Sequence, residues 1–405
     1  MNPLEFSQAS QTLKSSAVRD LLRFAHQPDV ISLAGGMPAT ELFDVDGIQA
    51  AIQTVLAQPD RLALQYGATE GQSSLHAAIR HLMQNRAMQL NVHRVLVTSG
   101  SQQGLDLIAR ALLNPGDAVI LERPNYLAAI QVFNLAQAQF IELETDEHGA
   151  KIEMLDALCA AKKPKLIYLV SNFSNPTGAS LALERRKHLI RWATKNKVLI
   201  LEDDPYGELR FRGNAVPPLL SLAESIQPEL PDAKDYCIYA GSLSKIIAPG
   251  LRLGWLVLPN ALFDTVARIK QAADLQTSSF TQEIAAAYLN SGRLAPHIEK
   301  ICAHYYQRQL AMLEALRRYF GDLITFNEPE GGMFIWATFK APVNTQSLLE
   351  IALKKGVIFV PGHCFYPTQA QTNALRLSYV SVASERLLEG VRRLREAYDE
   401  LITER

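Results

Sequence analysis

Residues 166–206, LIYLVSNFSNPTGASLALERRKHLIRWATKNKVLILEDDPY, contain the pattern that decides the fold. Two apolar runs, LIYLV (166–170) and VLILEDD (198–204), are separated by a turn-forming stretch and a segment with helical spacing. Short, continuously apolar runs are typical of parallel strands covered by helices on both faces. The same alternation includes VLVTSG (95–100), AVILE (118–122), CIYAGS (237–242) and LGWLVLP (253–259). The sequence therefore predicts an α/β protein with a mainly parallel sheet.

The chain changes character after about residue 260. A long helical pattern, IEKICAHYYQRQLAMLEALRRYF (298–320), is followed by short apolar runs at MFIWATF (333–339) and ALRLSYV (374–380). A chain of 405 residues is long for one compact domain. We expect a large domain over residues 43–289 and a smaller α/β domain formed by residues 1–42 and 290–405.

One internal segment has no clear place in this pattern. Residues 213–235, GNAVPPLLSLAESIQPELPDAKD, are rich in proline and predict a surface connection. The sequence leaves open whether this segment is only a surface excursion or helps to close a site.

Composition excludes several classes of partner. The 40 Lys and Arg residues nearly balance the 41 Asp and Glu residues, so nucleic acid and anionic membranes are poor candidates. Neither a membrane-spanning apolar run nor a metal-binding spacing of histidines occurs, and we expect no membrane association and no metal. Four cysteines without a CxxC pair favour a reduced, cytoplasmic protein.

Side chains suited to chemistry follow four of the predicted strands. In GSLSKIIAPGLRLGW (241–255), Lys245 lies among Ser242, Ser244 and Arg252, which together could hold one phosphate. Alone, this motif also fits a turn with a solvated lysine.

The other three motifs are also at strand ends. NFSNPTG (172–178) forms a tight turn that includes Asn175, and LEDDPYGELRF (201–211) places Asp203 three residues before Tyr206. Open α/β sheets bind ligands outside the carboxyl ends of their strands. VTSGSQQGLDL (97–107) contains a strand, a small-residue turn and the start of a helix. Because the start of a helix favours an anion, Ser101 and Gln102 are candidate phosphate ligands. Singly, each motif also fits an ordinary turn, an acidic strand end or a helix cap.

Together, and in this order, the four motifs resemble the fold-type-I pyridoxal-phosphate (PLP) aminotransferases of class I/II. The resemblance runs from LAGGMPA (33–39) to RLSY (376–379), and LQYGATEG (64–71) is most similar to the 2-aminoadipate and kynurenine type. It implies a large domain with a mainly parallel, seven-stranded sheet flanked by helices, plus a smaller α/β domain. It also implies PLP as the cofactor.

The resemblance implies a role for each cofactor-facing residue. Lys245 would hold PLP as a Schiff base and, once released, move the α-proton of the substrate. Asp203 would keep the pyridine nitrogen protonated. Tyr206 and Asn175 would hydrogen-bond the phenolic oxygen, and Tyr126 would stack on the ring. The residues that would share the phosphate are Ser101, Gln102, Ser242, Ser244 and Arg252.

The substrate-binding residues follow from the same resemblance. Arg376 would bind the substrate α-carboxylate with two parallel hydrogen bonds, helped by Asn175 and by the backbone at Gly36. Tyr66 would reach the phosphate in the neighbouring subunit, which implies a homodimer with shared active sites. Arg19, on an N-terminal helix, would bind a distal carboxylate, although it also fits a solvated helix charge.

The predicted function is the ping-pong transfer of an amino group between an L-amino acid and 2-oxoglutarate. The candidate donors are 2-aminoadipate, aromatic and branched-chain amino acids. A PLP-dependent carbon–sulfur β-lyase or other amino-acid lyase is the alternative, because PLP stabilises the same carbanion whichever bond breaks. A ligand-sensing module of a transcriptional regulator is a more distant alternative.

Overall fold

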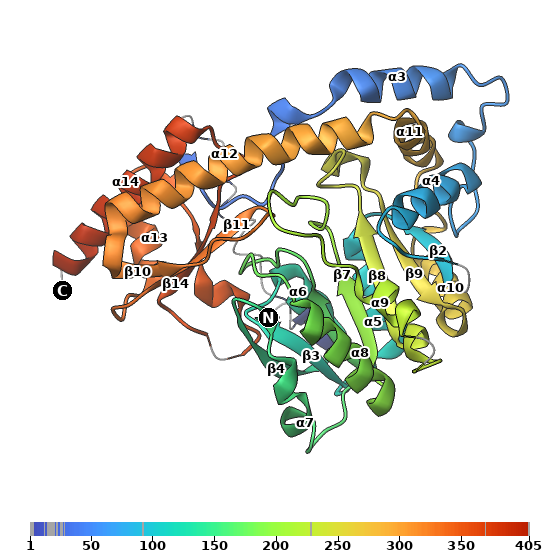
Figure 1. The fold of residues 1–405 in the computed structure, drawn as a ribbon, viewed down its shortest axis with the longest axis horizontal. Helices are drawn as coiled ribbons and strands as arrows, with labels where there is room; N and C mark the ends of the chain where they lie inside the picture. Colours follow the sequence, from blue (N-terminus) through green and yellow to red (C-terminus); the bar gives the residue numbers. More distant parts are fainter. Residues whose placement is uncertain are drawn as a thin grey trace.

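The computed structural model describes residues 4–11, 13, 21, 23–24, 27, 29–90, 93–226, 229–368 and 370–403. Within these residues, one large sheet of eight strands forms the centre of the fold (Figure 1). Its strands, in spatial order, are β2 (His93–Thr98), β9 (Gly254–Pro259), β8 (Cys237–Ser242), β7 (Leu199–Asp203), β6 (Leu166–Val170), β3 (Ala118–Arg123), β4 (Gln139–Asp146) and β5 (Gly149–Ala150).

The large sheet is mainly parallel, as predicted. Strand β9 runs antiparallel to both of its neighbours, β2 and β8, whereas β8, β7, β6, β3 and β4 are parallel. The seven longer strands match the predicted number. Strand β5 is an eighth, two-residue strand that forms a hairpin with β4.

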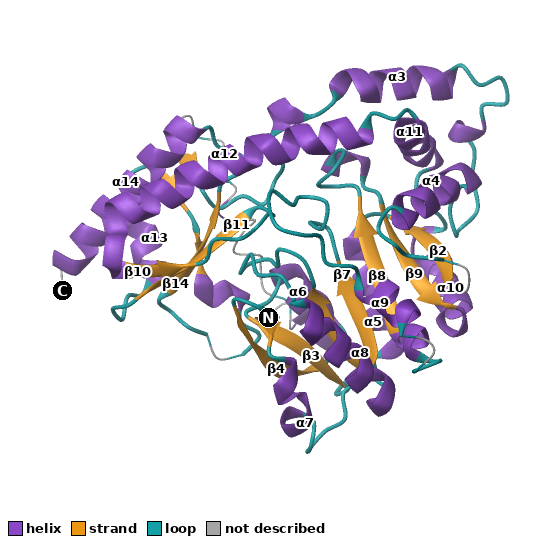
Figure 2. Ribbon diagram, viewed as in Figure 1, coloured by secondary structure: helices purple, strands orange, loops and turns teal. Residues whose placement is uncertain are grey.

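Helices cover both faces of this sheet (Figure 2). On β6, Leu166, Tyr168 and Val170 enter one hydrophobic core, whereas Ile167 and Leu169 enter the other, so both faces are buried. The first core contains side chains of α5 (Ser101–Leu112), α6 (Leu127–Leu135) and α10 (Asn260–Asp274). The second contains side chains of α3 (Val45–Leu56), α4 (Ser73–Gln84), α8 (Leu183–Asn196), α9 (Leu219–Ser225) and α11 (Ser279–Asn290).

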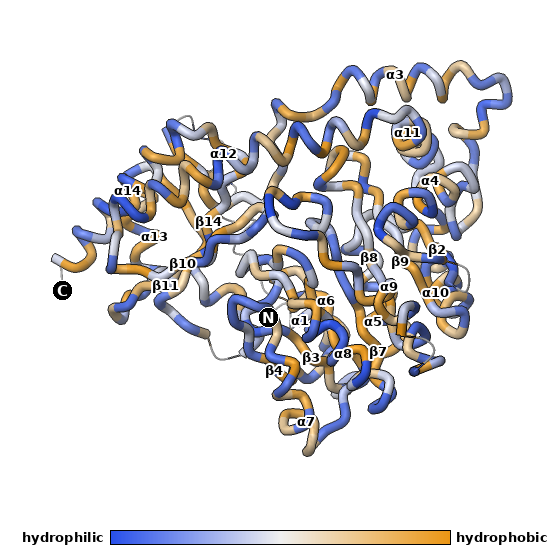
Figure 3. The backbone as a smooth tube through the Cα atoms, viewed as in Figure 1, coloured by the Kyte–Doolittle hydropathy of each residue, from blue (hydrophilic) through white to orange (hydrophobic). Residues whose placement is uncertain are grey.

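A second unit follows α11. The long helix α12 (Leu294–Phe320) leads from the large unit to a small antiparallel sheet, and it alternates hydrophobic and hydrophilic residues along its length (Figure 3). The order of this sheet is β10 (Ile324–Phe326), β11 (Phe334–Phe339), β14 (Ala374–Ser378) and β13 (Val360–Pro361). Two more helices complete the unit, namely α13 (Thr345–Lys354) and α14 (Ser384–Thr403).

The N-terminal part of the chain joins this second unit. Strand β1 (Ile31–Ser32) pairs in parallel with β12 (Val357–Ile358), and Gly390 of α14 packs against Ile31. Near the N-terminus the structure has a short helix, α1 (Gln8–Gln11), and in the large unit it has another, α7 (Leu155–Leu158). The predicted boundaries at residues 42 and 289 stay a prediction.

The prediction of a surface connection for residues 213–235 is wrong for part of that segment. Leu219 and Leu220 of α9 are fully buried. The backbone N–H of Leu219 donates to Glu202 at 2.8 Å, and Arg186 donates to the carbonyl of Pro217 at 2.8 Å. These buried polar anchors, together with apolar packing, hold the segment against α8 and the sheet.

In the described part of the chain, no helix is long and apolar enough to cross a membrane.

Candidate active site

A cavity of about 330 Å³ opens at the carboxyl ends of the parallel strands β6, β7 and β8, beside the start of α5. Parallel strands end on the same edge of a sheet, so residues far apart in sequence converge there. Twelve of the fourteen residues predicted for the site line this cavity, namely Gly36, Ser101, Gln102, Tyr126, Asn175, Asp203, Tyr206, Ser242, Ser244, Lys245, Arg252 and Arg376.

Two predicted residues are not among them. The side chain of Tyr66 is 77% exposed and lies outside the cavity. Arg19 lies outside the described residues, so its predicted contact with a distal carboxylate stays untested.

Asp203 is the last residue of β7 and is buried at the floor of the cavity. Its Oδ2 accepts a hydrogen bond of 2.9 Å from the hydroxyl of Tyr168, whereas its Oδ1 is buried and has no hydrogen-bond partner among the residues that the structure describes. Burial raises the pKa of Asp203 to about 7; the Tyr168 hydrogen bond opposes this rise and the charge of Asp204 adds to it. A cation placed at Oδ1 would therefore be bound strongly.

The neighbours of Asp203 point to the opposite face of the sheet, as the two-residue period of a strand requires. Asp204 forms an ion pair of 2.6 Å with Arg86 and accepts a hydrogen bond of 3.0 Å from Asn172. Glu202 accepts a hydrogen bond of 2.6 Å from the hydroxyl of Ser171, and its carboxylate lies 3.8 Å from the guanidinium of Arg186. Three consecutive buried carboxyls thus serve two different sides of the sheet.

Lys245 follows β8 and reaches into the cavity, where its Nζ donates to the backbone carbonyl of Gly36 at 2.9 Å. Burial lowers the pKa of Lys245 to about 8, and the positive charges of Arg376 and Arg252 add to this effect. A lowered pKa increases the fraction of neutral amine at physiological pH, and the neutral amine is the nucleophilic form.

Arg376 lies in β14 and belongs to the second unit. Its Nη1 donates to Asn175 Oδ1 at 2.8 Å and its Nη2 to the carbonyl of Ala34 at 2.5 Å. Within the described part of the chain, its buried Nε has no hydrogen-bond partner. The guanidinium carbon lies 4.3 Å from the centroid of the Phe334 ring. Burial lowers the pKa of Arg376 to about 10, so it stays charged at neutral pH.

Tyr206 lies beside Asn175 on the wall of the cavity. Its hydroxyl hydrogen-bonds the Asn175 side chain, and burial raises the pKa of Tyr206 above its ordinary range, with further contributions from Tyr126 and Asp203. Tyr126, just before α6, is also buried, and burial raises its pKa to about 12. Both phenols are therefore neutral donors at physiological pH.

The other end of the cavity is suited to an anion. Ser101 begins α5, whose free N–H groups lie there, and Arg252 donates to the carbonyl of Ser99 at 3.3 Å. Gly100 has a φ of +82°, and a Cβ at this position would lie 2.5 Å from Arg252 Nη2. Glycine is thus required for the guanidinium to approach the helix start.

These features fit the predicted cofactor at three separate points. The unpartnered Oδ1 of Asp203 suits a protonated ring nitrogen, the amine of Lys245 suits a carbonyl, and Arg252 with the start of α5 suits a phosphate.

The motifs did not reveal several residues of this site. Tyr168, which orients Asp203, was hidden in an apolar strand; its only signal was a phenol at an otherwise aliphatic position of LIYLV. Phe334, Phe365, Met37 and Leu127 also line the cavity. Met37 lies in LAGGMPA and Phe334 in MFIWATF, but neither stretch assigned them to the site, because an apolar wall is defined by shape and size.

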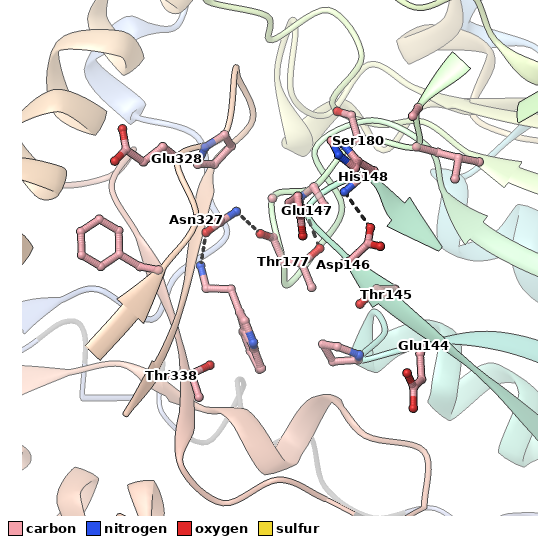
Figure 4. A pocket seen from close by; sticks show the side chains of 18 of the residues that line it. Glu144, Thr145, Asp146, Glu147, His148, Thr177, Ser180, Asn327, Glu328 and Thr338 are labelled. Atoms are coloured by element: carbon pink, nitrogen blue, oxygen red, sulfur yellow. Dashed lines mark hydrogen bonds between the residues drawn. The ribbon is translucent and has the colours of Figure 1, made fainter. Parts of the chain in front are cut away.

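A larger cleft of about 810 Å³ lies between the two units (Figure 4). Residues 144–148, from the end of β4, lie on one side, and β10 and β11 lie on the other, with Asn327 and Thr338 labelled. None of the twelve site residues listed above lines it. The smaller cavity, which contains the reactive groups, is therefore the candidate active site.

Comparison with known proteins agrees with this geometry. The family model "Aminotransferase class I and II" matches residues 28–394. The chain is 38% identical to aromatic-amino-acid aminotransferase 1 of Thermococcus litoralis, covering 98% of this chain and 94% of the relative. It is 34% identical to 2-aminoadipate transaminase of Thermus thermophilus, covering 99% of each.

A solved structure is similar over the same length. The kynurenine aminotransferase of Pyrococcus horikoshii, solved with pyridoxamine phosphate and kynurenine, has a TM-score of 0.92 and 38% identity, covering 98% of this chain and 97% of that one. The chain therefore belongs to the class I and II aminotransferases and is a PLP-dependent transaminase.

Proposed function

We propose that this transaminase takes its amino group from a medium-sized L-amino acid with an aromatic or branched apolar side chain and passes it to 2-oxoglutarate. The observation that carries the proposal is the apolar wall of the cavity, formed by Met37, Leu127, Phe334 and Phe365. Such a wall favours apolar side chains over charged ones. The names of the relatives, which include aromatic-amino-acid, 2-aminoadipate and kynurenine aminotransferases, support the same range.

An acidic substrate requires a second cation, and this holds for the acceptor 2-oxoglutarate as well as for the donor 2-aminoadipate. In the described residues, the cations that line the cavity are Lys245, Arg252 and Arg376, and each is assigned to another part of the reaction. Arg19 therefore remains the proposed ligand for a distal carboxylate, and 2-aminoadipate remains a candidate through it.

The proposed roles follow from the atoms that face the cavity. When bound, PLP supplies an electron sink that stabilises negative charge at the substrate α-carbon. Lys245 holds the cofactor and carries the α-proton through its Nζ. Asp203 would keep a proton on the ring nitrogen, and Tyr206 and Asn175 would donate hydrogen bonds to the phenolic oxygen.

The remaining groups hold and orient. Tyr126 would pack on the ring, and Arg376 would bind the α-carboxylate beside Asn175 and the backbone at Gly36, all of which line the cavity. Orientation of the Cα–H bond by this grip is the main contribution of the second unit. The proposed phosphate ligands are Ser101, Gln102, Ser242, Ser244 and Arg252.

A homodimer is part of the proposal. Leu62, Leu64 and Tyr66 are exposed by 62%, 66% and 77%, and Leu275 nearby is 48% exposed. The backbone N–H of Gly67 donates to Gln276, which places these two segments side by side. An exposed apolar patch of this kind supports contact with a second copy, in which Tyr66 would reach the other phosphate.

Two further assignments, the location and the domain division, are part of the proposal. A cytoplasmic location rests on four cysteines without paired spacing. The domain division near residue 290 is supported by the end of α11 at Asn290 and the start of α12 at Leu294.

The test is an absorbance titration of the PLP-loaded protein. L-leucine, L-kynurenine, L-2-aminoadipate and L-glutamate are added separately, without any 2-oxo acid. A transaminase loses its visible cofactor band with a good donor, and an aromatic or branched donor should act at the lowest concentration. Release of pyruvate and ammonia from a cysteine conjugate, without loss of the band, would instead support a lyase.

A further inference from the structure

Asn327 makes a link across the large cleft (Figure 4). Its Nδ2 donates a hydrogen bond to the backbone carbonyl of Thr177, and its Oδ1 accepts a hydrogen bond of 2.9 Å from the backbone N–H of Trp336. The Trp336 N–H can only donate, so it fixes which end of the amide is oxygen. The amide nitrogen must therefore face Thr177, which belongs to the other unit.

The turn that receives this hydrogen bond is compact. Gly178 N–H donates to the Ser174 carbonyl at 2.6 Å, and Ser174 N–H donates to the Ala179 carbonyl at 2.8 Å. Gly178 has a φ of +71°, and a Cβ there would lie 2.8 Å from the Phe334 carbonyl. A turn so closed and so closely packed moves as one piece, so a displacement at Thr177 also displaces Asn175.

Asn175 faces the active-site cavity from the same turn, where it accepts from Arg376. Arg376 lies directly opposite Trp336 in the pairing of β11 with β14. Among the described residues, two side-chain hydrogen bonds therefore attach the turn to this strand pair, one from Arg376 to Asn175 inside the cavity and one from Asn327 to Thr177 in the cleft.

These two attachments respond differently to substrate. An α-carboxylate at Arg376 competes with Asn175 for the guanidinium, so the inner attachment must be shared during each turnover. The outer attachment through Asn327 does not line the cavity and is independent of substrate.

We propose that Asn327 is a positioning residue for amino-acid binding: its hydrogen bond to Thr177 fixes the turn against β11 and β14, which sets the distance between Asn175 and Arg376. The inference rests on the proposed roles of Asn175 and Arg376. By fixing the position of Asn175, the hydrogen bond from Asn327 would also position the hydrogen bond that Asn175 donates to the phenolic oxygen of the cofactor.

The test compares Asn327→Ala and Asn327→Asp with Asn373→Ala. Asn373 is the matched control, because it is also half-buried in the second unit and its Nδ2 donates to a backbone carbonyl, that of Phe339, at 2.7 Å, without touching the turn. Asn327→Asp keeps the acceptor for Trp336 but loses the donor to Thr177. The thermal midpoint of each variant is measured to show that it is folded.

Both Asn327 variants should raise KM for the amino acid roughly 3- to 10-fold, as expected for one lost hydrogen bond, with a smaller change in kcat. The pH midpoint of the visible band of the PLP-loaded protein should also rise, because a weaker donor at Asn175 stabilises the deprotonated chromophore less. The control Asn373→Ala should change neither value.

Asn175→Ala separates the two levels of the argument. If it shifts the band and KM while both Asn327 variants match the wild type, Asn327 does not position the turn. If Asn175→Ala itself changes neither value, the proposed role of Asn175 fails first. If Asn327→Ala and Asn373→Ala change KM and the pH midpoint equally, the cause is a general destabilisation of the second unit. That result would overturn the inference.

Discussion

Replacing Asp203 by asparagine should stabilise the cofactor-free protein while weakening its hold on PLP. Asp203 is buried, and among the described residues the only hydrogen bond to its side chain comes from Tyr168, a bond that an asparagine oxygen can keep. A pKa of about 7 instead of the ordinary 3.8 means that ionised Asp203 destabilises the cofactor-free fold by ~4 kcal/mol at pH 8. Asparagine has no charge to bury.

The effect has a definite pH dependence. Because the pKa of Asp203 is raised in the folded state, the folded protein binds more protons than the unfolded chain between its two pKa values, 3.8 and about 7. Stability of the cofactor-free wild type therefore falls as pH rises through this window. The advantage of Asp203→Asn should grow from ~2 kcal/mol at pH 5.5 to ~4 kcal/mol at pH 8.

Thermal unfolding of the cofactor-free proteins at both pH values measures this difference. The midpoint of Asp203→Asn should exceed that of the wild type at pH 8 by roughly 4–8 °C. Added PLP should raise the wild-type midpoint more than that of the variant, because only the carboxylate can pair with the ring nitrogen. A variant that is less stable than the wild type at pH 8, or a pH-independent difference, would refute the reasoning.

Asp204→Asn is the matched control for this experiment. Burial disfavours the Asp204 carboxylate, but Arg86 and the Asn172 hydrogen bond outweigh burial and lower its pKa. Removing the charge leaves Arg86 with a weaker partner, so this neighbouring substitution should destabilise the protein, by ~3 kcal/mol or more. The same substitution at two adjacent carboxyls should therefore change the stability of the cofactor-free protein in opposite directions.

Three further predictions concern the site and the assembly. The rate at which the cofactor-free protein develops its visible band with PLP should rise about 10-fold per pH unit up to a pH of about 8 and then level, because protonated Lys245 does not react; a rate that still rises at pH 10 would contradict the lowered pKa. Arg376→Lys should raise KM for amino acids ~10- to 100-fold and leave the visible band in place, since lysine lacks the planar fork that holds a carboxylate. Leu64→Glu should convert the proposed dimer to monomers in light scattering, because Leu64 is 66% exposed and a charge there does not disturb a monomer; an unchanged mass would place the interface elsewhere.

The sequence predicted the sheet well where its strands are buried on both faces. LIYLV and VLILEDD correspond to β6 and β7; because helices cover both faces of the sheet, the strand positions are apolar except for Glu202 and Asp203 at the end of β7. Strand β4, with the sequence QFIELETD, was missed: it lies near the edge of the sheet and is half-exposed, so its pattern is mixed.

The site was predictable to the extent that its groups follow strand ends in fixed motifs. Twelve residues converge as expected from the family resemblance. Contacts such as those of Tyr168 with Asp203 and Asn327 with Thr177 were not predictable, because they join separate elements through single side chains. The buried anchoring of α9 was missed for a related reason: its partners Arg186 and Glu202 lie on other elements.

The three successive carboxyls at the end of β7 have a consequence for insertions and deletions. A slip of β7 by one residue in either direction would still present a carboxyl to the cavity, because Glu202 and Asp204 flank Asp203. The opposite face of the sheet would lose an ion pair in either case. In one direction Pro205 would take the place of Asp204 beside Arg86, and in the other Leu201 would take the place of Glu202 beside Arg186. The alignment of the catalytic strand is thus enforced from the side of the sheet that never meets the substrate.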